Sequence, residues 1–352
     1  MIKLSSSSIL SVAGGLAAII LSSAASASPY GVPSTDPSSR PFEGGGSATG
    51  IPSPSTQPGP VVSPQAVQHA LTETVSTQQI SSTSLQQIVT ISNAIGFRMS
   101  SLQPRPAHLT SNESLSGMAA GGQNAWNTWS NLTNNNNEYK SLSQNVVAST
   151  VGFDYALNPA LVVGASVAVD RASGSLLNAT TKGYSVAPYI GWQISKEFSL
   201  DASAGWGESK TQAGTVEFKP ERFFYGANLN YTQWAGNLQF AGKASYLYGE
   251  EKYDATTLNT KNKIDQWRLG GQVSYWLSGG AMPFVGVSYS HDKTKTALIT
   301  TNDLGKNAWL WSAGVNVFSL KDNLSGGIVF NRESGRSNSK RESVMLNLNY
   351  RF

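Results

Sequence analysis

The sequence predicts an all-β protein: a twelve-stranded antiparallel transmembrane β-barrel, preceded by one α-helix and a disordered N-terminal linker. Two observations predict this class. From about residue 123 to the end, apolar and polar residues alternate with a period of two in twelve segments. Most segments reach the roughly 9–11 residues that a tilted strand needs to cross a bilayer, and the connections between them alternate between short and long.

The composition is compatible with such a barrel and excludes several other classes. Of the 352 residues, 39% are hydrophobic and only 13% are charged, which is about half the charge of an ordinary soluble domain. The absence of cysteine excludes a disulfide scaffold, a thiolate metal site and a cysteine nucleophile. The net charge of +4 is small and scattered, so a nucleic-acid binder is not expected.

The N-terminus reads as an export signal followed by a linker. Residues 1–27 combine Lys3, the apolar stretch Ile9–Leu21 and the cleavage site Ala25–Ala27, which is the pattern of a secretory signal peptide. The alternative is an uncleaved anchor helix, and the glycines and serines of the apolar stretch disfavour it. Residues 28–61 are rich in Ser, Pro, Gly and Thr, and we expect a disordered linker because they offer little apolar area to bury.

A single helix is predicted over residues 62–103, and residues 104–121 form a loop. Apolar residues spaced by three and four form one stripe on this helix: Leu85, Ile88, Ile91, Ile95 and Met99. The rest of its surface is Ser, Thr and Gln. One interpretation is a coiled coil that oligomerises the protein, although Ser and Thr are mediocre helix formers. The other is a helix lodged in a confined polar space.

The barrel domain spans residues 122–352. The predicted strands lie near residues 123–133, 143–157, 160–171, 181–195, 198–210, 221–235, 237–250, 263–277, 282–292, 306–319, 324–333 and 341–352. The predicted long loops are Leu132–Leu142, Ala172–Thr180, Lys210–Pro220, Glu251–Asn262, Asp292–Gly305 and Glu333–Lys340. Short turns at one end and long loops at the other are typical of outer-membrane barrels.

The two faces of the strands predict which side meets lipid. Charged residues fall mainly on the less apolar face, which we expect to line the lumen: Asp154, Asp170, Asp201, Lys243, Arg268 and Arg351. Aromatic residues near the short turns are candidates for one interface girdle: Tyr155, Trp192, Tyr231, Trp234, Trp276, Phe318 and Tyr350. Those toward the long loops are candidates for the other: Trp206, Phe223, Trp267, Tyr289 and Trp309. A soluble lipocalin-like barrel or β-sandwich would instead carry charge outside.

The last strand points to a particular family. Apolar residues on its outer face end at the terminal aromatic residue, and this pattern resembles the strand read by the outer-membrane assembly machinery: Val344, Leu346, Leu348, Tyr350 and Phe352. The stretch Ala119–Trp129 is similar to the start of the β-domain of autotransporters, the type V secretion family. The order of signal, linker, helix and twelve strands resembles the same family over about residues 62–352.

This resemblance implies a translocator in the outer membrane, with the helix inside its pore and the preceding chain at the cell surface. It also implies signal-dependent export, contact with outer-membrane lipid, and help from periplasmic chaperones and the barrel assembly machinery. The passenger would be very short or absent, because only about residues 28–61 precede the helix. The run Asn134–Asn137 is interpreted as solvated loop and not as a cleavage site in the helix.

No catalytic, cofactor or metal-binding motif is evident, so we expect no enzyme, no cofactor and no small-molecule substrate. The one histidine of the barrel, His291, is predicted to point outward while Ser288 and Ser290 point inward, which leaves no nucleophile–base pair. Three functions stay open: an autotransporter-type translocator and surface anchor, a stand-alone porin-like channel, and a surface adhesion protein acting through its long loops.

Overall fold

The computed structural model describes a helix over residues 87–99 and a barrel over residues 126–351, with short gaps in its connections. The described barrel ranges are 126–139, 142–174, 179–213, 216–255, 258–295, 305–321, 324–337 and 339–351. The predicted signal peptide, linker and loop 104–121 lie outside the described residues, as do Leu85 and Phe352. Within the described part, no helix is both long and apolar enough to span a membrane.

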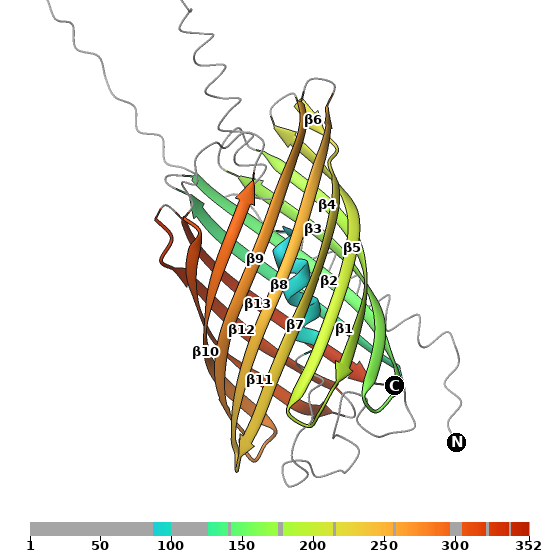
Figure 1. Ribbon diagram of the computed structural model, residues 1–352, viewed down its shortest axis with the longest axis vertical. Helices are drawn as coiled ribbons and strands as arrows, with labels where there is room; N and C mark the ends of the chain where they lie inside the picture. The colour runs from blue at the N-terminus through green and yellow to red at the C-terminus, as the bar shows by residue number, and fades with distance from the viewer. Residues whose placement is uncertain are drawn as a thin grey trace, which may run out of the picture. The chain divides into compact units, whose positions relative to one another are not determined.

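Twelve long antiparallel strands close into a barrel, as the sequence predicted (Figure 1). Each long strand pairs with its neighbours along the chain, and the circle closes where β1 pairs with the last strand, β13, along its whole length. A three-residue strand, β6, extends one hairpin beyond the barrel. The strands are β1 Trp126–Tyr139, β2 Leu142–Asn158, β3 Leu161–Gly174, β4 Thr180–Gln193, β5 Phe198–Ala213, β6 Val216–Phe218, β7 Glu221–Ala235, β8 Leu238–Ala255, β9 Leu258–Tyr275, β10 Ala281–Lys295, β11 Asn307–Lys321, β12 Leu324–Ser334 and β13 Ser339–Arg351.

The two ends of the barrel differ. One end, here called the turn end, holds the connections predicted to be short and both the start of β1 and the end of β13. The opposite end, here called the β6 end, holds the connections predicted to be long. Two of those predictions were wrong, since β1 continues to Tyr139 and the β8–β9 hairpin leaves only residues 256–257 between its strands. The run Asn134–Asn137 is strand because it pairs with β2 on one side and β13 on the other.

The strands bury one face and expose the other, with the period of two that the sequence showed. On β3, Ser166, Ala168 and Asp170 are buried, while Val167 and Val169 are exposed. The exposed face therefore carries the large apolar side chains, and the polar side chains point inward. A soluble barrel would show the opposite distribution, because its apolar residues would fill the interior.

Aromatic side chains lie at both ends of the outer face, with a correction at the turn end. Toward the β6 end, Trp206, Phe223, Trp267, Tyr289 and Trp309 are all exposed. At the turn end, Trp192 is exposed, but three of the predicted girdle residues point into the barrel. Trp276 is buried and stacks on Phe318 with ring centroids 5.4 Å apart, and Trp234 lines an internal cavity. Trp234 and Phe318 occupy inward positions of β7 and β11, and Trp276 directly follows β9, so their aromatic character alone was misleading.

Inside the barrel, large aromatic rings lie over glycines of the neighbouring strand. A Cβ atom on Gly164 would come within 2.4 Å of the Tyr189 ring, and one on Gly152 within 2.3 Å of Trp129. The absence of these Cβ atoms lets the rings lie flat against the wall. The same arrangement recurs at the opposed pairs Phe224–Gly205 and Phe284–Gly314.

Candidate functional site

The helix over residues 87–99 lies inside the ring of strands, where Figure 1 shows it in cyan. The predicted stripe is buried, with Ile88, Ile91 and Met99 each at 0% exposure. Most of the other positions are covered as well, since Gln87, Val89, Thr90, Ala94 and Arg98 are also buried, whereas Asn93 is exposed. The interpretation as a helix in a confined polar space therefore applies to this segment.

The helix ends at the turn end of the barrel in a buried ion pair. Arg98 donates two hydrogen bonds to Asp154 of β2, from Nε at 2.8 Å and from Nη2 at 3.0 Å. Asp154 also accepts bonds from Asn127 at 2.9 Å and from the Tyr189 hydroxyl at 3.2 Å. A third Arg98 bond reaches Asn349 of β13 at 3.2 Å. A bidentate pair with these supporting bonds fixes both the depth and the rotation of the helix.

The first described turn of the helix is held by a second buried charge cluster, toward the β6 end. Arg222, near the start of β7, lies 2.8 Å from Asp170 and 3.3 Å from Glu251. The Arg222 guanidinium also donates to the side-chain oxygen of Gln87 on the helix. Ser209 completes the cluster with a 3.4 Å bond to Glu251. A single wall arginine thus links strands β3, β7 and β8 to the helix.

Two further polar contacts join the middle of the helix to the wall. Asn135 of β1 donates to the Thr90 hydroxyl at 3.0 Å, and Arg268 of β9 donates to the Asn93 side chain at 3.3 Å. Asn135 belongs to the asparagine run that was interpreted as loop. Because Asn135 lies in β1 and not in a solvated loop, its side chain can contact the helix.

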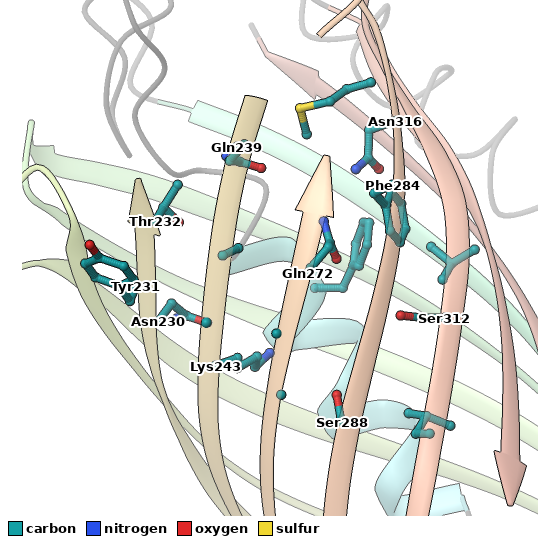
Figure 2. Close-up of a pocket in the computed structure, with 18 of the residues that line it drawn as sticks. Asn230, Tyr231, Thr232, Gln239, Lys243, Gln272, Phe284, Ser288, Ser312 and Asn316 are labelled. Atoms are coloured by element: carbon teal, nitrogen blue, oxygen red, sulfur yellow. The ribbon is translucent and has the colours of Figure 1, made fainter. Parts of the chain in front are cut away.

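The helix does not fill the lumen evenly. A cavity of about 260 Å³ remains beside it and is lined by the helix residues Asn93 and Phe97 and by strands β7 to β13. Figure 2 shows polar side chains around this cavity, among them Lys243, Gln272 and Ser288. Arg268 also lines it, and its Nε is buried without a hydrogen-bond partner. The cavity is therefore lined by both polar and apolar side chains, and two of them are cationic.

The predicted lumen residues lie at different places in the barrel. Asp154 and Asp170 belong to the two clusters that hold the helix, whereas Asp201 bonds to Asn228 at 2.5 Å and to Asn230 at 3.0 Å. Lys243 and Arg268 line the cavity, and Arg351 lies 3.4 Å from the Asn127 side chain. On the last strand, Val344, Leu346 and Leu348 are exposed on the outer face.

The residues considered for catalysis do not come together. His291 Nδ1 lies 2.8 Å from the Asn307 side chain of the neighbouring strand, while Ser290 is buried and Ser288 lines the cavity. In the part of the chain that the structure describes, no group of three or more His, Asp or Glu side chains could hold a metal ion.

Sequence reasoning missed the side chains that hold the helix most firmly. Arg98 and Arg222 were not singled out, nor was Glu251, which fell in a predicted loop. A signal for Arg98 was available, because it is the only charged residue between positions 87 and 99. A lone arginine on an otherwise uncharged helix in a confined space requires a buried acidic partner.

Comparisons with known proteins agree with this architecture. The model of the autotransporter β-domain family matches residues 120–331. The β domain of the Bordetella autotransporter BrkA superposes with a TM-score of 0.56 at 16% identity, covering 65% of this chain and 100% of that one. The translocator domain of the autotransporter NalP from Neisseria meningitidis gives 0.54 at 12% identity, covering 77% and 99%. Among functionally curated proteins, none matches the sequence.

Proposed function

Because the chain belongs to the autotransporter β-domain family, we propose that its barrel holds the helix 87–99 as a plug and displays residues 28–61 at the cell surface. The barrel is an outer-membrane translocator and anchor. Pore formation and the insertion of the helix constitute its mechanism, and the proposal needs no catalytic step.

The direction of the helix is the observation that carries this proposal. Its first described residue, Gln87, contacts Arg222 near the β6 end, and Arg98 contacts Asp154 toward the turn end. The chain then enters β1 at the turn end, where β13 also finishes. A helix in this direction supports a path in which the preceding residues leave the pore at the β6 end, while the loop to β1 stays at the turn end.

A surface-accessibility experiment tests the topology. An epitope tag inserted near Gly45 is expected to bind antibody and to be removed by protease on intact cells. A matched tag in the turn Gly236–Asn237 is expected to be protected until the outer membrane is permeabilised. If the Gly45 tag is protected while the turn tag is accessible, the orientation is reversed and the proposal fails.

The plug is tested by conductance in planar bilayers. The full chain is expected to be nearly closed, because the helix and its buried partners occupy the lumen. Deletion of residues 62–103 is expected to give a large, steady conductance. A full chain that conducts as well as the deletion variant would exclude the plug.

The cavity beside the helix, with its two cationic side chains, favours a second candidate function, a stand-alone channel. Lys243 and Arg268 line this cavity, and a pore lined by cations favours anions. In that case the full chain should show a small but reproducible anion-selective conductance, which Lys243→Gln would reduce. An unselective or absent current in the full chain would leave only the translocator.

The partners follow from the same family membership. We propose that β13 is recognised by the barrel assembly machinery through Val344, Leu346, Leu348, Tyr350 and Phe352, after signal-dependent export and delivery by periplasmic chaperones. The three exposed apolar side chains on the outer face of β13 support this assignment. The family membership also supports a non-enzymatic role.

A further inference from the structure

The outer face of the barrel carries a row of cations on three neighbouring strands at the β6 end. Arg171 of β3 is directly opposite Lys182 of β4, and Lys182 is directly opposite Lys210 of β5. All three side chains are exposed on the lipid side of their strands. Directly opposed residues of antiparallel strands lie about 5 Å apart, and like charges at that distance repel one another.

The chain compensates this repulsion only at one end of the row. Lys210 forms an ion pair with Glu217 of β6 at 2.8 Å. Among the described residues, no carboxylate lies within ion-pair distance of Arg171 or Lys182. The acid next to the row on this face, Glu208 of β5, stands opposite Tyr184 and not opposite a cation of the row. The opposed cations Arg171 and Lys182 can therefore accept a counter-charge from outside the chain.

Another row of cations at the same end of the barrel has different residues at its opposed positions. On β7, β8 and β9 the opposed residues are Glu221, Lys252 and Lys261, so an acid stands in the row itself. Lys261 is also paired with Glu250 at 2.8 Å. The two rows present the same kind of charge at one barrel end, but only the β7–β9 row has an acid directly opposite one of its lysines.

The position of the row along the barrel axis indicates which region of the membrane surrounds it. Along β4, Lys182 lies ten residues from the exposed Trp192 of the turn end, which is about 34 Å of strand. At a tilt of about 40°, this corresponds to about 26 Å along the membrane normal, close to the thickness of the apolar band of such barrels. The row therefore lies where lipid headgroups begin, directly beyond the exposed Tyr184 and Val169.

We propose that Arg171, Lys182 and Lys210 form a binding site for the phosphorylated headgroup of an outer-leaflet lipid, whose acyl chains lie along the apolar face below. A phosphate offers the counter-charge that the row lacks, and an arginine guanidinium binds phosphate oxygens in bidentate geometry. The assignment to the outer leaflet rests on the orientation under the proposed function, but binding of the phosphorylated lipid does not.

Binding is measured with the full chain in neutral phosphatidylcholine nanodiscs, using a bisphosphorylated glucosamine lipid as the probe and native mass spectrometry to count retained lipids. The double variant R171Q/K182Q is expected to retain the probe about tenfold less than the wild type. The matched control K252Q/K261Q removes the same charge at the same end and is expected to bind normally. Equal losses in both double variants would overturn the site.

Two further arms identify the ligand chemistry. The dephosphorylated form of the probe should lose most of its retention, and millimolar inorganic phosphate should not displace the intact lipid. Equal retention without phosphate groups, or ready displacement by free phosphate, would overturn the assignment to a lipid headgroup. If the double variant fails to fold, acetylation of lysines in the wild-type protein tests the site instead. The bound probe should protect Lys182 from acetylation more than Lys261, and equal protection of the two lysines would contradict the site.

This experiment is independent of topology. Lipid retention in nanodiscs does not depend on which leaflet the β6 end faces in cells. A protected tag at Gly45 together with specific lipid retention would overturn the orientation alone. An accessible tag without retention would overturn the lipid site alone.

Discussion

Neutralising Asp154 tests how firmly the barrel wall holds the helix. The variant Asp154→Asn removes the charge of a residue that is 1% exposed and leaves the Arg98 guanidinium buried without its counter-charge. Breaking a buried ion pair by removing one partner costs about 3–5 kcal/mol. Displacement of the helix would release Arg98 to water, so this cost should favour the displaced state over the inserted one.

The expected effect is a change in how often the pore opens. At about 1.4 kcal/mol per tenfold change, the equilibrium between inserted and displaced helix should shift by roughly two to four orders of magnitude. Single-channel recording in planar bilayers measures this shift directly, as the fraction of time spent in the large-conductance state.

Two controls separate the ion pair from a general loosening of the lumen. Asp201→Asn neutralises another buried carboxylate, whose hydrogen bonds go to Asn228 and Asn230 and not to the helix, and it should open the pore far less. The double variant Arg98→Gln with Asp154→Asn removes both charges and should open less than Asp154→Asn alone. An unchanged open fraction in Asp154→Asn, or an equal rise in Asp201→Asn, would refute the reasoning.

Three further variants test other contacts. Gly249→Leu should expel the helix and raise the open fraction, because a Cβ atom there would lie 3.0 Å from an Ile88 methyl group. Gly242→Leu on the same strand should leave bilayer conductance unchanged, because the nearest atom to a Cβ there is 3.9 Å away. Arg222→Met removes the buried counter-charge of Asp170 and Glu251 and should destabilise the barrel by about 3–5 kcal/mol in urea unfolding. Arg332→Gln removes an exposed ion pair and should cost under about 1 kcal/mol, so equal unfolding midpoints of the two variants would contradict the difference. Leu346→Arg puts a charge on the lipid face at a cost of about 2–4 kcal/mol and should lower the yield of heat-modifiable barrel on gels; unchanged yield would argue against that face meeting lipid.

Much of the barrel could be predicted because the alternation of apolar and polar residues along a strand identifies its two faces. The alternation along the β3 segment already distinguished Val167 and Val169 from Ser166 and Asp170, and burial follows that pattern. The low total charge and the large apolar outer stripes indicated lipid around the barrel for the same reason. No partner strand is needed to read a period of two.

The predictions failed where the secondary structure or the side-chain direction of a residue depends on residues that are distant in sequence. The Asn134–Asn137 run has low intrinsic preference for strands, but it is paired on both sides and therefore continues β1. Trp234 and Trp276 were predicted as interface anchors, yet Trp234 lines the internal cavity and Trp276 is buried against Phe318. Aromatic composition near a turn does not reveal which face of the strand carries the ring.

The sequence by itself determined the fold class, the number of long strands, the lipid-facing side and the presence of a helix before the barrel, because these depend on local periodicity. Only the tertiary structure decided what holds that helix. Arg98 and Asp154 are 56 positions apart, and Gln87 and Arg222 are 135 apart. Closure of the barrel brings them together, and no local pattern records which lumen residue will face which turn of the helix.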